Sequence, residues 1–199
     1  MTVNILTVCT GNICRSPWAE RYLQLHLDDL APTTFQVTSA GTFALTGEPM
    51  DPLSEGELIR VGGTAQDFTA RQLTENVLAE AHLVLGMTTE HRDQVLSMTP
   101  RLLKRAFTVR EFAHLLAQLP ADTERTIPRG AQPETVTQRW KTVPRLLSSL
   151  RGSGMNSEMN VGDPYRLGPE AFASMVDQLR PALDQLIDHE RKWQAPLQA

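Results

Sequence analysis

Apolar and polar residues follow two different periods along the chain. Runs of consecutive or alternating apolar residues, typical of strands, are separated by segments whose apolar residues lie three and four positions apart, as in amphipathic helices. The first kind of pattern predicts strands over residues 3–8, 35–40 and 83–87, and residues 101–107 lead into a fourth strand.

Helices are predicted between and after these strands. The helical spacing covers residues 17–30, 52–61, 74–81, 88–98, 109–119 and 133–150, and a last helix begins at residues 168–170. Capping residues support two of these helix starts. Asp51 precedes Pro52, a favourable first residue, and Thr108 with Glu111 forms a capping-box pattern.

Prolines and glycines interrupt the second half of the chain. Pro144 falls inside the pattern of residues 133–150, so we expect one kinked helix or two short ones, and Pro181 should kink the last helix. Residues 120–133 are polar and contain prolines, which predicts a loop. Residues 151–162 carry several glycines, which predicts a mobile loop.

The order of the predicted elements defines the fold class. Strands alternate with helices through the first half of the chain, which indicates an α/β fold with a parallel sheet and right-handed crossovers. With 199 residues, the chain is expected to form a single domain.

The stretch with the most specific chemistry joins the first strand to the first helix. It reads Cys9, Thr10, Gly11, Asn12, Ile13, Cys14, Arg15, Ser16 and Pro17. Such a junction directs backbone N–H groups and the positive end of a helix dipole at one point, which favours an anion. Gly11 and Asn12 tolerate the left-handed backbone of a tight loop. The N–H groups of residues 10–16 and the planar fork of Arg15 could therefore hold a phosphate dianion.

The same electrostatic field would act on Cys9. It favours the thiolate over the thiol, which makes Cys9 a candidate nucleophile near neutral pH. Ser16 could donate a hydrogen bond to the sulfur and stabilise it as a leaving group. A buried cysteine beside an ordinary turn is the plain alternative, and the combination of strand, glycine, Arg-Ser-Pro and helix argues against it.

This loop sequence resembles the phosphate loop of the low-molecular-weight protein tyrosine phosphatase family. The resemblance implies a cysteine phosphatase on a flavodoxin-like fold, with a four-stranded parallel sheet flanked by helices. It also implies an aspartate acid in an Asp-Pro-Tyr motif, and the chain has Asp163, Pro164 and Tyr165. Ser39 lies in a Ser-Ala-Gly-Thr stretch similar to another family motif. The resemblance implies that this serine supports the loop together with Asn12.

These residues suggest a mechanism. Cys9 would attack the phosphoryl group, Arg15 would bind its oxygens, and Asp163 would protonate the leaving group and later activate water. Pro164 would restrict the backbone beside the acid. We expect no metal or other cofactor, because arginine and backbone N–H groups supply the positive field.

Composition narrows the range of partners. The chain has 19 basic and 23 acidic residues, a net charge of −4, so nucleic acid is not an expected partner. No apolar run is long enough to cross a membrane, and the first residues do not resemble a signal peptide, so we expect a cytoplasmic protein. The two cysteines share one loop, which is neither a disulfide framework nor a metal set. Expected substrates are a phosphorylated protein or a small aryl phosphate, with phosphate-like oxyanions as inhibitors.

Three positions depart from the family pattern and bear on the substrate. Leu45 stands where the family often has an aromatic residue, although Phe43 is close by, and Arg166 replaces a second aromatic after Asp-Pro-Tyr. Phe68 replaces a common histidine. The first two leave a preference for phosphotyrosine open, and Arg166 either favours an acidic peptide or is a solvated surface charge.

The chain is also longer than compact family members between residues 107 and 162. Its apolar spacing predicts a packed helical addition at about residues 108–160, placed before the acid loop. The addition is either a structural extension or a cover over the active site.

Two other functions remain open from the sequence. Arsenate reduction occurs on the same scaffold, but without cysteines after Cys14 it would need a low-molecular-weight thiol. A non-catalytic phosphate-binding module is the second alternative.

Cys14 could form a reversible disulfide with Cys9 or could be a small buried residue. The five histidines are scattered, and packing explains each of them.

Overall fold

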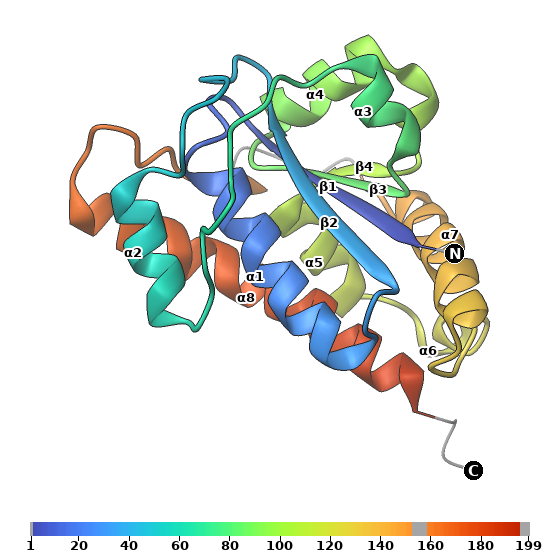
Figure 1. The fold of residues 1–199 in the computed structure, drawn as a ribbon. Helices are drawn as coiled ribbons and strands as arrows, with labels where there is room; N and C mark the ends of the chain where they lie inside the picture. The colour runs from blue at the N-terminus through green and yellow to red at the C-terminus, as the bar shows by residue number, and fades with distance from the viewer. Residues whose placement is uncertain (1, 153–158, 196–199) are drawn as a thin grey trace.

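The protein is described by a computed structural model that covers residues 2–152 and 159–195 (Figure 1). Its centre is one sheet of four parallel strands in the order β2-β1-β3-β4. The register between the two longest strands places Val3 opposite Phe35 and Cys9 opposite Gly41. The strands are β1 (Val3–Cys9), β2 (Phe35–Gly41), β3 (Leu83–Gly86) and β4 (Ala106–Thr108).

Helices connect and follow the strands. They are α1 (Arg15–Leu30), α2 (Pro52–Arg60), α3 (Glu75–Glu80), α4 (Thr89–Met98), the 3₁₀ helix η1 (Pro100–Leu102), α5 (Val109–Ala117), α6 (Ala121–Glu124), α7 (Pro133–Ser149) and α8 (Pro169–Gln194). None of the helices in the described part of the chain has both the length and the apolar character needed to cross a bilayer.

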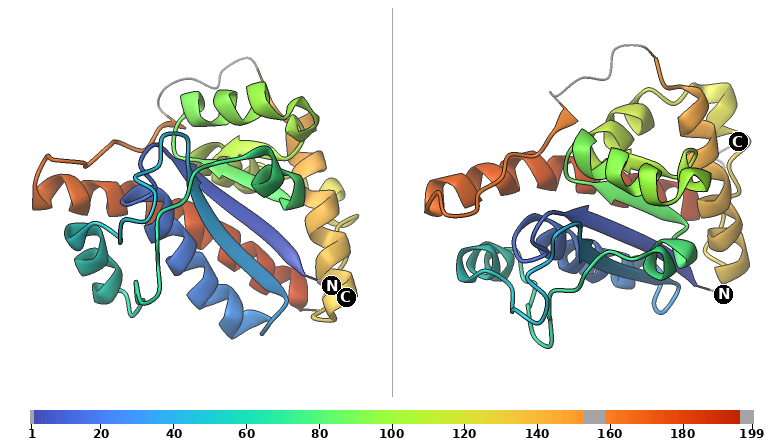
Figure 2. Two further views of the ribbon diagram at one scale, coloured as in Figure 1. Left: turned by 45° about the horizontal axis from the view of Figure 1, so that its top comes forward. Right: turned by 90° about the horizontal axis from the view of Figure 1, so that it is seen from above.

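The helices form a layer on each side of the sheet. Helices α1, α5 and α8 cover one face, and α3 and α4 cover the other, as Figures 1 and 2 show. Along β1, Ile5 belongs to the core under the first group, whereas Leu6 and Val8 belong to the core under α3 and α4. Since successive side chains of a strand point to opposite faces, this double burial explains why β1 is almost continuously apolar.

The predicted sheet and most predicted helices are confirmed, with shifted limits. Helix α1 begins at Arg15, two residues before the predicted start, and β4 is only three residues long because residues 100–102 form η1. Thr108 and Glu111 form the predicted capping box, in which each side chain bonds the other's backbone N–H. Asp51 caps α2 as predicted, accepting from the backbone N–H of Leu53 at 2.9 Å.

The prediction of a loop throughout residues 120–133 is wrong, because this segment contains α6. The short helix is fixed from outside: Glu124 pairs with Lys192 of α8 at 2.7 Å and accepts from Trp193 Nε1 at 3.3 Å. Helices α7 and α8 each continue through their proline, so α7 is one helix. Part of the predicted mobile loop, residues 153–158, lies outside the described residues.

Helix α7 packs at the end of the sheet where the strands begin. The Trp140 ring lies 5.9 Å from the ring of Phe35, the first residue of β2, and 6.3 Å from Phe112 of α5. A fully buried ion pair joins α7 to α8, because Arg139 contacts both carboxylate oxygens of Glu190 at 2.6 and 2.9 Å. Because Cys9 ends β1, its loop lies at the other end of the sheet. Thus α7 extends the core and does not cover that loop.

Candidate active site

The loop that follows β1 turns its amide hydrogens inward. Backbone N–H groups of the segment 42–51 donate hydrogen bonds of 2.8–3.0 Å to carbonyl oxygens of the loop, those of Cys9, Thr10, Gly11 and Ile13. Across a trans peptide bond, the C=O of one residue and the N–H of the next point in opposite directions. The bonded carbonyls point out toward the 42–51 segment, so the following N–H groups point into the loop. The result is a nest of donors next to the start of α1.

Asn12 holds this loop in shape from inside. It has a left-handed φ of 56° and is completely buried. Its amide nitrogen donates to Ser39 Oγ at 2.8 Å and to Ser16 Oγ at 3.0 Å, and its oxygen accepts from the backbone N–H of Arg71 at 2.8 Å. Ser39 in turn donates to Glu20 at 2.6 Å. Strand β2 is therefore hydrogen-bonded to the loop through the Ser39–Asn12 pair.

The sulfur of Cys9 lies 2.9 Å from Ser16 Oγ. Because that oxygen already accepts a hydrogen bond from Asn12, its own hydroxyl proton is available to the sulfur. Donation to sulfur favours the thiolate, which is the form that acts as a nucleophile. The geometry therefore places Ser16 where it can stabilise the sulfur anion.

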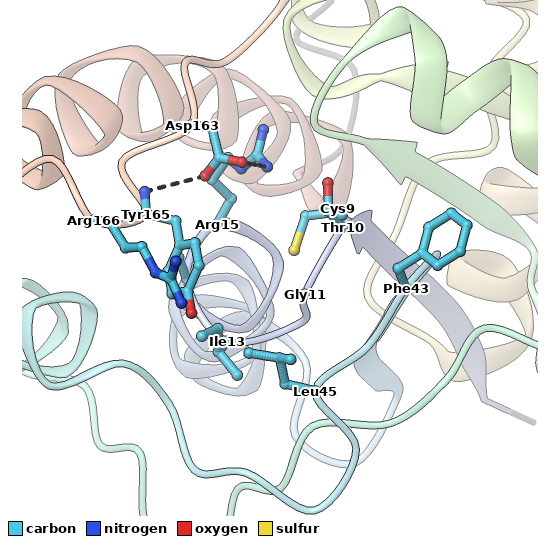
Figure 3. Close-up of a pocket in the computed structure, with 11 residues that line it drawn as sticks. Cys9, Thr10, Gly11, Ile13, Arg15, Phe43, Leu45, Asp163, Tyr165 and Arg166 are labelled. Carbon is cyan, nitrogen blue, oxygen red and sulfur yellow. Dashed lines mark hydrogen bonds and ion pairs between the residues drawn. The ribbon is translucent and has the colours of Figure 1, made fainter.

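Arg15 and Asp163 form an ion pair at the top of the loop, drawn as a dashed line in Figure 3. Arg15 Nη2 lies 2.7 Å from Asp163 Oδ2, and Nη1 donates to the carbonyl of Val161 at 3.4 Å. The Arg15 side chain is 4% exposed and that of Asp163 is 51% exposed. Among the residues that the structure describes, Arg15 Nε has no hydrogen-bond partner. This buried N–H is a free donor for an oxyanion.

A tight turn presents Asp163. Asp163 Oδ1 accepts from the backbone N–H of Tyr165 at 3.2 Å, and the carbonyl of the buried Pro164 accepts from Leu167 at 3.0 Å. Arg166 has a φ of 65°, which is unusual for a residue with a side chain. The turn directs Asp163 toward Arg15, while Tyr165 and Arg166 follow on the rim.

The loop forms the floor of a cleft of about 340 Å³. In Figure 3, Tyr165 and Arg166 stand on one side, whereas Leu45 and Phe43 come from the other side. The Arg166 guanidinium lies 5.0 Å from the centre of the Tyr165 ring. Phe43 is 73% exposed. The cleft therefore combines an anion nest with partly apolar walls, which suits a phosphate attached to an apolar group.

Cys14 also borders the cleft but differs from Cys9. It is 4% exposed, and burial raises the pKa of its thiol well above the ordinary value. The carboxylate of Asp51 and the nearby Cys9 act in the same direction, and Arg15 opposes them. Cys14 therefore remains a thiol at neutral pH.

The structure brings together the residues that the sequence singled out, from the Cys9 loop, Ser39 and the Asp163 turn. Sequence reasoning missed Arg71 and Glu20, which bond this network, and attributed His91 to packing. His91 Nε2 lies 3.0 Å from Thr10 Oγ1. The one available signal was its place in the first turn of a helix that follows a sheet strand, since such helix starts border the sites of parallel sheets. Within residues 2–152 and 159–195, no group of three metal-ligating side chains is close enough to hold a metal ion.

Comparisons with known proteins agree with this geometry. Residues 4–124 match the family model described as low molecular weight phosphotyrosine protein phosphatase. Over 99 residues, or 50% of this chain, the sequence is 36% identical to the low molecular weight protein-tyrosine-phosphatase Wzb and 35% identical to Etp, both of Escherichia coli K12. Each match spans 64% of the relative, slightly less than two thirds of its length.

A solved structure extends the likeness to the whole fold. The low molecular weight protein tyrosine phosphatase from T. tengcongensis superimposes with a TM-score of 0.67 and 26% identity, covering 94% of this chain and 99% of its own. The family model, the sequence relatives and the fold give the same result: the chain belongs to the low molecular weight phosphotyrosine protein phosphatase family.

Proposed function

We propose that this chain hydrolyses phosphate monoesters through a cysteinyl-phosphate intermediate, and that its substrates are phosphotyrosine proteins or small aryl phosphates. One observation carries the proposal. The buried guanidinium of Arg15 contacts the carboxylate of Asp163, and both border the cleft that contains Cys9. This shared cleft supports the assignment of Cys9 as nucleophile, Arg15 as anion-binding group and Asp163 as acid.

Binding would begin with an exchange at Arg15. The dianion is held by the inward N–H groups of the loop and by Arg15 Nε, which has no acceptor among the described residues. To complete a bidentate fork, a phosphate oxygen would replace Asp163 at Nη2. The exchange releases the carboxyl group of Asp163, which is half exposed, toward the leaving oxygen of the substrate.

The chemistry would then proceed in two displacements. In the first, Cys9 Sγ forms a bond to phosphorus and the bond to the ester oxygen breaks. Asp163, which takes up a proton from solvent once it has left Arg15, gives that proton to the ester oxygen. In the second, Asp163 accepts a proton from water, the water oxygen bonds to phosphorus, and the S–P bond breaks. The products are an alcohol or phenol, inorganic phosphate and the Cys9 thiolate, which Ser16 stabilises.

The walls of the cleft favour an aryl ester. Leu45 and Ile13 offer apolar contacts on one side and the ring of Tyr165 on the other, so a flat phenyl group would fit between them. Arg166 at the rim adds a positive charge, which would favour a peptide with acidic residues next to the phosphotyrosine.

The arsenate alternative finds less support. The chain has only two cysteines, both in the loop, and burial keeps Cys14 protonated. No further thiol follows that could relay electrons. The alternative of a non-catalytic phosphate-binding module gives no reason for Cys9, Arg15 and Asp163 to border the same cleft.

A phosphatase assay tests the proposal. Wild-type protein should hydrolyse p-nitrophenyl phosphate and phosphotyrosine peptides, and Cys9→Ser should reduce turnover by at least about a thousandfold. Thiol oxidation that depends on arsenate, without ester hydrolysis, would instead support the reductase. If wild type binds phosphopeptides but hydrolyses none of the esters, the binding module is the better description.

A further inference from the structure

We propose that His91 is a positioning residue, which holds the Cys9 loop and the Asp163 turn in one fixed relation through the start of helix α4. The inference rests on the proposed phosphatase function, in which His91 would position the catalytic loops.

The first half of the connection runs from the loop to α4. The imidazole is 5% exposed and uses both ring nitrogens, with Nε2 3.0 Å from Thr10 Oγ1 and Nδ1 2.8 Å from Thr88 Oγ1. Thr10 follows the nucleophile directly and borders the cleft. Thr88 caps α4 by accepting from the backbone N–H of His91. The loop residue next to Cys9 is therefore tied to the cap of a helix.

The second half runs from the same helix start to the acid. The first N–H of α4, that of Thr89, donates to the side chain of Asn160 at 2.8 Å. The backbone N–H of Val161 donates to the carbonyl of Met87 at 2.8 Å. Val161 lies two residues before Asp163, and its carbonyl also accepts from Arg15. The segment 87–91 thus contacts both catalytic loops, which are about 150 residues apart in the sequence.

A neutral imidazole suits this place. Burial and the nearby positive charge of Arg15 lower the pKa of His91 to about 4, and the carboxylates of Glu90 and Asp163 oppose this only in part. At pH 7 the ring therefore has one N–H donor and one acceptor nitrogen. Each threonine hydroxyl can donate or accept, so either tautomer satisfies both contacts. His91 can fix Thr10 without adding a charge beside the bound phosphate.

The experiment is a double-mutant cycle on Thr10→Val and His91→Leu, measured as kcat/KM for p-nitrophenyl phosphate and as affinity for inorganic phosphate. Each single variant should lose on the order of tenfold in kcat/KM, and the double variant should lose no more than the worse single one. His91→Gln, whose amide can reach Thr10, should recover most of the loss. His114→Leu removes an exposed histidine of α5 and should match wild type.

Losses that multiply in the double variant would overturn the proposal, as would a His91→Leu enzyme with wild-type activity and phosphate affinity. If His91→Leu does not fold, His91→Asn takes its place in the cycle, because the shorter amide can replace Nδ1 toward Thr88 but cannot reach Thr10. A wild-type protein that turns over no ester would refute the phosphatase function alone, because the phosphate-affinity cycle still decides whether His91 positions the loop.

Discussion

Arg15 Nη2 lies 2.7 Å from Asp163 Oδ2, although 148 residues separate the two in the sequence. The pair joins the first helix of the fold to the turn that precedes the last one. A substrate phosphate and Asp163 would compete for the same guanidinium. We therefore expect the ion pair in the protein without substrate, and we expect the reaction to start when a phosphate oxygen replaces Asp163 at Arg15.

Replacing the acid should therefore change binding and chemistry in opposite directions. Asp163→Asn should lower kcat by about a hundredfold, and more for esters with poor leaving groups, because no proton is supplied to the leaving oxygen. The same change should strengthen inhibition by phosphate, since a negative charge that competes for Arg15 is removed. Steady-state kinetics with a series of aryl phosphates measures both effects.

The matched control is Asp177→Asn, on the exposed side of α8, which should leave kcat and phosphate inhibition as in wild type. Equal losses for good and poor leaving groups would contradict the assignment of Asp163 as the acid.

The two cysteines should react differently in the folded protein. Iodoacetamide at pH 7.5 should modify Cys9 first and leave Cys14 unmodified, because burial raises the pKa of the Cys14 thiol. Inorganic phosphate should protect Cys9 by filling the cleft. Mass spectrometry of the peptides identifies the modified residue, and rapid modification of Cys14 without unfolding would contradict the expected order.

The disulfide between Cys9 and Cys14 remains a prediction with its own test. Peroxide would oxidise Cys9 to a sulfenic acid, and the Cys14 sulfur would displace water from it to form the bond. Activity should then return on addition of dithiothreitol. Irreversible loss, with a Cys9 sulfinic acid in the mass spectrum and no linked peptide, would reject the proposed protection.

The stability of the protein should depend on pH through His91. Its folded-state pKa of about 4 lies below the ordinary value of 6.5, so the unfolded chain binds more protons between these values. Stability should therefore fall as the pH is lowered through this window, by about 2 kcal/mol from pH 7 to pH 5 for this group. Urea unfolding of wild type and His91→Gln at several pH values gives the free energy of unfolding as a function of pH. This free energy should change less steeply with pH in the variant. An equal pH dependence of stability in the two proteins would contradict the low pKa of His91.

The buried pair between α7 and α8 should be sensitive to removal of one partner. Arg139→Leu leaves the buried Glu190 without its ion-pair partner and should cost about 3–5 kcal/mol of the free energy of unfolding. In contrast, Arg191→Leu disrupts the exposed pair with Asp188 and should cost less than about 1 kcal/mol. Denaturant unfolding measures both losses.

The double variant Arg139→Leu with Glu190→Leu should recover part of the first loss, since no charge remains unpaired. An Arg139→Leu protein as stable as Arg191→Leu would contradict the importance of the pair.

Much of the fold was predictable because its signals are local. These signals depend only on residues that are close in the sequence. Examples are the apolar run of β1, the capping box at Thr108 and the glycine and asparagine of the loop. The resemblance to the phosphatase family is confirmed by the match over residues 4–124. It also pointed to Asp163, for which local patterns alone indicate only a turn, and the role of Asp163 as the acid stays a prediction.

The rest depends on contacts between distant segments. Thr10 and His91 are 81 residues apart, and nothing in the spacing of the histidines indicates their hydrogen bond. Helix α6 was missed because its stability comes from Lys192 and Trp193 of α8 and not from its own four residues. Apolar periodicity predicted that α7 packs against the core, but it could not say at which end of the sheet.

The late position of Asp163, the proposed acid, has a consequence for biosynthesis. A ribosome that has released the segment 4–124 has delivered the sulfur, the arginine and the donor nest, but not Asp163. The turn that carries Asp163 is also held by α8, since the backbone N–H of Gly162 donates to Gln178 at 3.0 Å. With Asp163 as the acid, turnover would require that this turn and the part of α8 that carries Gln178 have also left the exit tunnel.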